Sequence, residues 1–154
     1  MKEEAQDLSS PRPRGEENAR TMSFSRFLMP RPPMPAPPPR VVATPAALDL
    51  IARLRREHGA ILFHQSGGCC DGSAPMCFAV GDFALGDGDV HLGAIGGADF
   101  FISGPQYAAW RHTQLIIDVV PGRGGMFSLE NGSGQRFLLR SRVFDAAEAA
   151  ALDA

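Results

Sequence analysis

Apolar residues recur with helical spacing directly after Thr44 and Pro45. Four of them fall at i, i+3, i+4 and i+7, which is one face of a helix: Ala47, Leu50, Ile51 and Leu54. Thr44 suits the N-cap and Pro45 the first helical position, while Gly59 suits the position just past the end. The pattern therefore predicts a helix over residues 45–58.

Short runs rich in β-branched and aromatic residues follow this helix, with glycine-rich turns between them. We expect strands at residues 60–65, 78–85, 90–95, 99–103, 113–120, 126–130 and 135–144. The last two are expected to form a hairpin across Asn131-Gly132-Ser133-Gly134. One helix followed by mostly antiparallel strands predicts an α+β domain that closes into a barrel or a sandwich.

The two ends of the chain differ in composition from this region. Residues 1–40 hold nine of the 13 prolines and almost no apolar periodicity, which is typical of a disordered tail with polyproline character. The single β-rich domain is expected at 44–144, and the alanine-rich residues 145–154 form a short helix or tail. The first 40 residues lack the unbroken apolar stretch of a secretory signal, so we expect a cytoplasmic protein.

Charge and hydropathy exclude two classes of partner. With 15 basic and 17 acidic residues the net charge is −2, which favours neither nucleic acid nor an anionic membrane surface. No apolar run reaches the roughly 18 residues that a membrane helix needs. The chain also carries no nucleotide-binding motif.

Cys69, Cys70 and Cys77 are the only cysteines, and they lie within nine residues. An odd number of adjacent cysteines makes a poor disulfide framework, and a cytosol keeps such thiols reduced. Glycines bound the segment and let its backbone turn tightly: Gly67, Gly68 and Gly72. A glycine-bounded loop that presents reduced thiols favours metal binding or catalysis.

Two histidines and several carboxylates complete the candidate site. His64 ends the strand that leads into the cysteine loop, and His112 precedes the long strand at 113–120. Thiolates with one or two imidazoles suit iron or zinc, so the predicted ligands are Cys69, Cys70, Cys77, His64 and His112. Asp71 and Asp118 are candidates to hydrogen-bond these ligands and fix their orientation, and Glu130 is a further candidate carboxylate. The alternative for Asp118 is an ion pair with Arg123, Arg140 or Arg142.

Several runs of the chain resemble the bacterial family called domain of unknown function 779. They are residues 63–73, 112–120, 122–124, 127–130 and 136–142, and the resemblance covers about residues 44–144. Proteins of that family are described alongside aldehyde or alcohol dehydrogenases, including acetaldehyde dehydrogenases. The resemblance therefore implies an accessory role in aldehyde metabolism, with such a dehydrogenase as partner.

The order of elements is also similar to that of A-type iron–sulfur carriers of the HesB/IscA type. Those proteins place one cysteine after a Gly-Gly turn, where Cys69 stands here, and a Cys-Gly-Cys near their end. Leu139-Arg140-Ser141 stands at about the second place, so the carrier's full ligand set is absent. The resemblance implies a HesB-like fold more directly than it implies cluster transport.

Three functions remain open from the sequence. The first is a small metal-binding protein, holding iron or zinc, that is accessory to a dehydrogenase system. The second is a thiol enzyme or sensor in which Cys69 or Cys70, activated by His64, attacks aldehydes or oxidants. The third is a non-catalytic binding module with buried cysteines. Whether the protein is an enzyme stays open, and free strand edges favour a homodimer.

Overall fold

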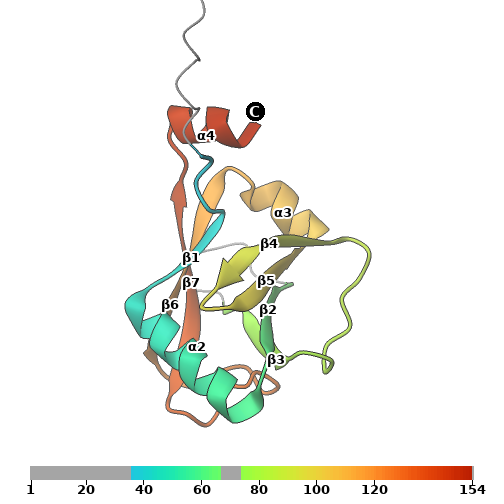
Figure 1. Cartoon of the computed structure of the whole chain (residues 1–154), viewed down its shortest axis with the longest axis vertical. Coiled ribbons are helices and arrows are strands. Elements are labelled where there is room, and N and C mark those ends of the chain that lie inside the picture. The colour runs from blue at the N-terminus through green and yellow to red at the C-terminus, as the bar shows by residue number, and fades with distance from the viewer. Residues whose placement is uncertain (1–35, 67–73, 154) are drawn as a thin grey trace, which may run out of the picture. The chain divides into compact units, whose positions relative to one another are not determined.

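The computed structural model describes residues 36–66 and 74–153, which form seven strands and three helices (Figure 1). These residues fall within one compact unit, Pro35–Ala154. The elements are β1 (Val41–Ala43), α2 (Pro45–His58), β2 (Ile61–Gln65), β3 (Met76–Ala79), β4 (Asp89–Ile95), β5 (Ala98–Ser103), α3 (Gly104–Trp110), β6 (Thr113–Pro121), β7 (Gln135–Val143) and α4 (Ala146–Asp153). The predictions for residues 1–35 and for the cysteine-loop residues 67–73 lie outside the described residues.

The strands form two mixed sheets, ordered β1-β6-β7 and β3-β2-β5-β4. The pairs β1/β6 and β2/β5 are parallel, and the other pairs are antiparallel. The expected α+β composition is confirmed, but the barrel is wrong because the two sheets do not join into one closed ladder. The pairing of β4 with β5 shifts by one residue between His91, which pairs with Phe101, and Gly93, which pairs with Phe100. A Cβ added at Gly93 would lie 3.5 Å from the side chain of Val41 on β1.

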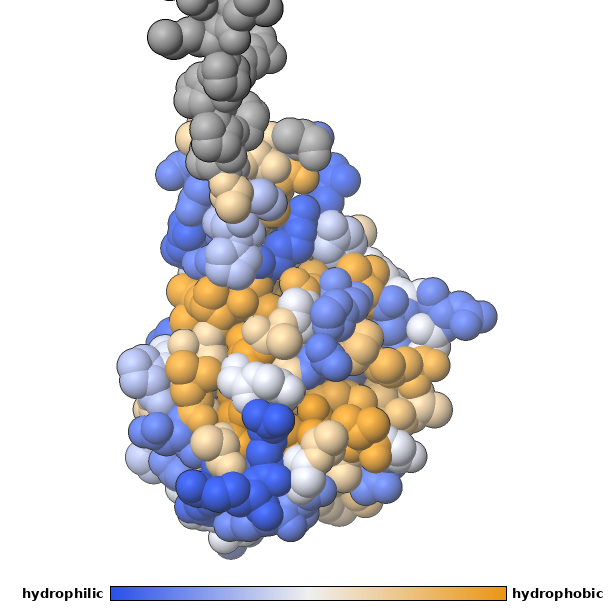
Figure 2. Space-filling model, viewed as in Figure 1, coloured by the Kyte–Doolittle hydropathy of each residue, from blue (hydrophilic) through white to orange (hydrophobic). Residues whose placement is uncertain are grey.

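A hydrophobic core lies where the apolar faces of the two sheets meet. Phe63 of β2 lies edge-on to Phe137 of β7, with ring centroids 4.9 Å apart, and stacks with Phe100 of β5 at 6.0 Å. The apolar stripe of α2 packs against this core, and all four of its predicted residues are buried. On the face drawn in Figure 2, hydrophobic residues over the sheets lie between the hydrophilic surface of α2 and that of the α4 region.

Most of the predicted helices and strands are present in the structure, and a few differ or were not predicted. The helix predicted at 45–58 is α2, and the short helix predicted near the end is α4. The strand expected at 126–130 is wrong: turns occupy this segment, and the side chain of Phe127 is 76% exposed. The strand expected at 78–85 ends at Ala79. Two elements were not predicted, β1 and α3.

No helix among the described residues is long and apolar enough to cross a membrane.

Thr44 joins the start of α2 to the neighbouring sheet. Its hydroxyl oxygen accepts a hydrogen bond from the Ala47 amide at 3.2 Å, which confirms the predicted N-cap. The same hydroxyl donates to Oδ1 of Asp118 on β6 at 2.9 Å. One side chain therefore caps the helix and links its first turn to β6.

Replacing Thr44 with alanine is expected to lower the free energy of unfolding by about 1–2 kcal/mol, because the helix cap and the bond to Asp118 are lost together. Urea unfolding measures the change. The matched variant Thr44→Ser keeps the hydroxyl and is expected to retain most of the stability. Equal stability of the alanine and serine variants would contradict this account.

Candidate functional site

His64 lies near the end of β2, on the face of its sheet that points away from the core. Its register partners are Met76 on β3 and Phe101 on β5. The imidazole packs against the ring of Phe83 at 4.7 Å, and only 5% of the residue is exposed. The segment between β3 and β4, which contains Phe83, thus shields this histidine from water.

The imidazole of His64 is held by a carboxylate from a strand that is not its neighbour. Nε2 of His64 lies 2.9 Å from Oδ1 of Asp89, the first residue of β4, and β5 runs between the two strands. Oδ2 of Asp89 accepts the amide of Gly86 at 2.7 Å. The hydrogen bond from His64, and then that from Gly86, lowers the pKa of Asp89.

The charge on Asp89 fixes which nitrogen of His64 can do chemistry. An ionised carboxylate only accepts hydrogen bonds, so Nε2 of His64 donates to it. In the neutral ring the lone pair then belongs to Nδ1. Nδ1 is therefore the atom of His64 that can bind a metal or take a proton.

Cys77 faces the opposite side of the same sheet. It pairs with Phe63 in the register, one position away from the His64–Met76 pair, and side chains alternate between the faces of a strand. Cys77 is fully buried in the core, and this burial, followed by the nearby Glu130, raises the pKa of its thiol. The described structure thus does not bring His64 and Cys77 together.

His112 lies in the turn between α3 and β6, where its carbonyl accepts the Phe144 amide at 3.1 Å. It lines a groove with residues of α3 and α4. Among residues 36–66 and 74–153, no group of three or more histidine, cysteine, aspartate or glutamate side chains is arranged to hold a metal ion. A metal site with three or more such ligands would therefore need residues outside those ranges.

Asp118 forms an ion pair with Arg140, which is one of the three arginines that were its alternative partners. Its Oδ2 accepts from Nε of Arg140 at 3.0 Å, and its Oδ1 accepts from the Val119 amide and from Thr44. The Val119 amide, then Arg140, lowers the pKa of this carboxyl. Both carboxylate oxygens of Asp118 thus have partners within the fold.

The remaining predicted site residues lie outside the described residues: Cys69, Cys70, Asp71, Gly67, Gly68 and Gly72. In the sequence, Cys69 follows His64 by five residues, and β2 ends at Gln65. Sequence reasoning missed Asp89, since it is 25 residues from His64 along the chain. Its only signal was its place at the end of the turn sequence Gly86-Asp87-Gly88-Asp89, directly before the strand expected at 90–95.

Glu130 is the most deeply buried carboxyl of the described part, with no exposed surface. Ser128 donates its hydroxyl to Oε2 of Glu130 and accepts the Cys77 amide at 2.8 Å. Oε1 has no hydrogen-bond partner among the described residues, and it lies so close to Gly124 that a Cβ there would come within 2.8 Å. Burial raises the pKa of Glu130.

A raised carboxyl pKa gives stability a definite pH dependence. The folded chain holds the Glu130 proton more tightly than the unfolded chain, so the free energy of unfolding falls as pH rises from about 4.5 through the folded pKa. The slope is at most about 1.4 kcal/mol per pH unit for one proton. Glu130→Gln is expected to remove this decline, as measured by urea unfolding between pH 4 and 8.

Two comparisons separate Glu130 from other titrating groups. Asp89 and Asp118 have lowered pKa values, so their contributions are lost only as pH falls below about 3.8. Glu57→Gln is the matched control, because its side chain is 52% exposed on α2. If the Glu130→Gln and wild-type pH profiles were parallel, the burial argument would fail.

Comparison with known proteins gives a family without an activity. A family model described as "Domain of unknown function (DUF779)" matches residues 50–143. This match begins within α2 and runs to the end of β7, and it includes His64 and residues 67–73 with Cys69 and Cys70. No curated protein matches the chain.

Proposed function

Because the chain belongs to the DUF779 family, whose description gives no function, we propose a function from the site: a small metal-binding protein that holds iron or zinc. The proposed ligands are Nδ1 of His64 and the thiolates of Cys69 and Cys70. The observation that carries the proposal is the hydrogen bond of 2.9 Å between His64 and Asp89. His64 precedes Cys69 and Cys70 in the sequence by five and six residues.

The bond to Asp89 suits a metal ligand. Histidines that bind metals commonly donate their second ring nitrogen to a carboxylate, which fixes the ring and raises its basicity. In this proposal Asp89 has the orienting role that was predicted for Asp71 and Asp118. Thiolate and imidazole together suit iron or zinc among the common metals.

The proposed ligand set is smaller than the one predicted from sequence. Cys77 points into the core with a thiol that burial keeps protonated, which disfavours it as a ligand. His112 lines a groove with α3 and α4, and the described residues offer it no cluster of further ligands. We therefore leave both residues out of the proposed metal site.

The test is elemental analysis of the full chain purified without oxygen. We expect about one iron or zinc ion per chain, lost in Cys69→Ser, Cys70→Ser and His64→Gln. The matched controls are Cys77→Ala and His91→Gln; His91 pairs with Asp99 at 3.0 Å on the same sheet face but is exposed. Absence of metal from the wild type, or its retention in all three ligand variants, would overturn the proposal.

The same hydrogen bond favours a second candidate, thiol chemistry. A base oriented by a third group is the arrangement that activates a catalytic cysteine. Here Nδ1 of His64 would take the proton of Cys69 or Cys70. The thiolate would then add to an aldehyde carbonyl carbon, forming an S–C bond, and the carbonyl oxygen would receive the proton.

Iodoacetamide alkylation of the metal-free chain tests this candidate. Thiol chemistry predicts that one of the two cysteines reacts rapidly near pH 7 and that His64→Gln slows it. Slow alkylation together with absence of metal would leave only a non-catalytic binding module.

The proposed partner, from the family resemblance, is an aldehyde or alcohol dehydrogenase. Its test is the activity of a purified metal-dependent dehydrogenase with the metal-loaded protein and with the metal-free His64→Gln variant. A gain of activity with the first and not the second is expected. Equal activity in both cases would remove this partner without affecting the metal proposal.

A further inference from the structure

A groove of about 320 Å³, open to solvent, lies where α3, α4 and the chain before β1 meet. Its size is within the range of small-molecule sites in proteins. Among its lining residues are Arg40, Tyr107, Arg111, His112, Phe144 and Leu152. The groove is separate from the His64 site, and nothing in the proposed function uses it.

Two guanidinium groups in the groove have no carboxylate partner among residues 36–66 and 74–153. Arg40 donates from Nη1 to the carbonyl of Arg111 at 2.9 Å, and its Cζ lies 5.5 Å from the centre of the Tyr107 ring. In the described part of the chain, neither Arg40 nor Arg111 makes an ion pair within 4 Å, even though Asp153 lines the same groove. By contrast, Arg140 pairs with Asp118 at 3.0 Å.

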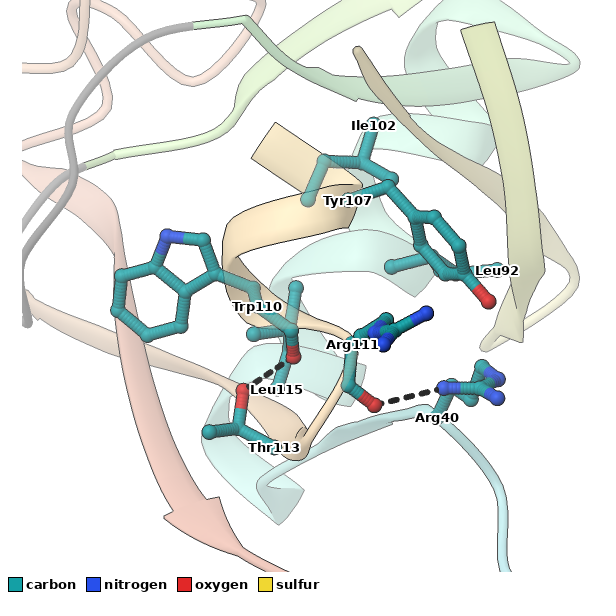
Figure 3. A pocket seen from close by; sticks show the side chains of 8 residues that line it. All are labelled: Arg40, Leu92, Ile102, Tyr107, Trp110, Arg111, Thr113 and Leu115. Atoms are coloured by element: carbon teal, nitrogen blue, oxygen red, sulfur yellow. Dashed lines mark hydrogen bonds between the residues drawn. The ribbon is translucent and has the colours of Figure 1, made fainter. Parts of the chain in front are cut away.

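These charged groups border an apolar notch of about 10 Å³, roughly the space of one water molecule. Its apolar lining comes from Leu92, Ile102, Trp110 and Leu115. Figure 3 shows the guanidinium groups of Arg40 and Arg111 and the hydroxyl of Tyr107 gathered on one side of this notch. Three hydrogen-bond donors therefore lie together next to apolar surface.

Polar contacts hold α4, which forms one wall of the groove, and its apolar side chains do not fill the groove. Arg142 makes two hydrogen bonds to the Glu148 carboxylate, at 2.9 and 2.8 Å, which lower the pKa of Glu148 to about 2. Glu148 and Asp145 also accept each other's backbone amides. No residue of α4 is buried, so Leu152 keeps its apolar surface available.

We propose that this groove binds a small organic anion, with an oxyanion head group between Arg40 and Arg111 and a short apolar chain against Phe144 and Leu152. Guanidinium forks bind carboxylate and phosphate oxygens in the same geometry, so the head group is of either kind. The Tyr107 hydroxyl supplies a further donor. The apolar chain replaces water on the Phe144 and Leu152 surfaces.

Isothermal titration of the full chain with defined probes tests the site. The probes are acetate, butyrate, hexanoate, butyl phosphate, inorganic phosphate and butanol. We expect affinity to rise by about fourfold per methylene from acetate to hexanoate, with butanol not binding. Tighter binding of butyrate than of butyl phosphate assigns the head group as carboxylate, and the reverse order assigns it as phosphate.

Variants separate the two parts of the site. Arg111→Gln is expected to weaken butyrate binding by about tenfold or more, and Leu152→Ser to flatten the chain-length dependence while acetate binding is kept. Arg123→Gln removes the same charge from an exposed position away from the groove and should change nothing. Circular dichroism verifies that each variant is folded.

The proposal is overturned if none of the anions binds. It is also overturned if Arg123→Gln weakens binding as much as Arg111→Gln, because the anion would then respond only to net charge. Metal loading at the His64 site is expected to be unchanged in Arg111→Gln, so this test fails or succeeds independently of the proposed function.

Discussion

Asp89→Asn is expected to lower the affinity of the protein for iron or zinc by about 10–100-fold, which is typical for loss of a carboxylate behind a metal-bound histidine. In the present structure Asp89 accepts from both His64 and Gly86. An asparagine has one acceptor oxygen in place of two, and it carries no charge to raise the basicity of the imidazole. The His64 ring would therefore be both less basic and less firmly held.

The measurement is a competition titration of the metal-loaded protein with a chelator of known affinity. Asp99→Asn is the matched control, because Asp99 holds His91 at 3.0 Å on the same sheet face while both side chains are more than half exposed. If thiol chemistry is the function, Asp89→Asn should instead slow alkylation near pH 7. An unchanged chelator titration together with unchanged alkylation would remove His64–Asp89 from the site.

Phe63→Ala is expected to give the largest loss of stability, about 3–5 kcal/mol. The side chain is fully buried, and its ring contacts Phe100 within its own sheet and Phe137 in the other sheet. Truncation removes both contacts and leaves a cavity between layers that can close only partly. The loss is a large fraction of the 5–15 kcal/mol that is typical of a whole domain.

Urea unfolding measures this loss, with two comparisons. Phe63→Leu keeps most of the volume and is expected to lose about 1–2 kcal/mol. Phe127→Ala removes the same ring from a residue that is 76% exposed, and is expected to stay within about 0.5 kcal/mol of the wild type. Similar losses for Phe63→Ala and Phe127→Ala would contradict the core assigned here.

Local signals account for the elements that could be predicted from sequence. Thr44, Pro45 and the apolar stripe determine α2, because cap, first turn and buried face all agree. The segment around Phe127 misled the prediction because its apolar residues alternate like a strand, while glycines and Asn131 on either side favour turns. The helix α3 had a usable signal in Ser103-Gly104-Pro105, whereas β1, with three residues, is too short to be recognised.

The candidate site was harder to predict because it depends on tertiary structure. Sequence alone placed His64 at the end of a strand beside the thiols, which is correct for its position in β2. It could not show that Asp89 reaches His64 across β5, or that Cys77 points to the other face. Both facts follow from strand order and register, and the spacing of residues along the chain does not reveal either.

The outer edge of β3 has a consequence for how the protein behaves at high concentration. The amide of Cys77 donates to the hydroxyl of Ser128, and the carbonyl of Cys77 accepts from the amide of Leu129. The carbonyl of Ala79 accepts from the amide of Asp82. An edge strand with three of its outward polar groups already satisfied offers less for a strand of another molecule to pair with. Segment 125–130 thus protects this edge from amyloid-like strand addition, and substitutions that detach it should first appear as aggregation in storage.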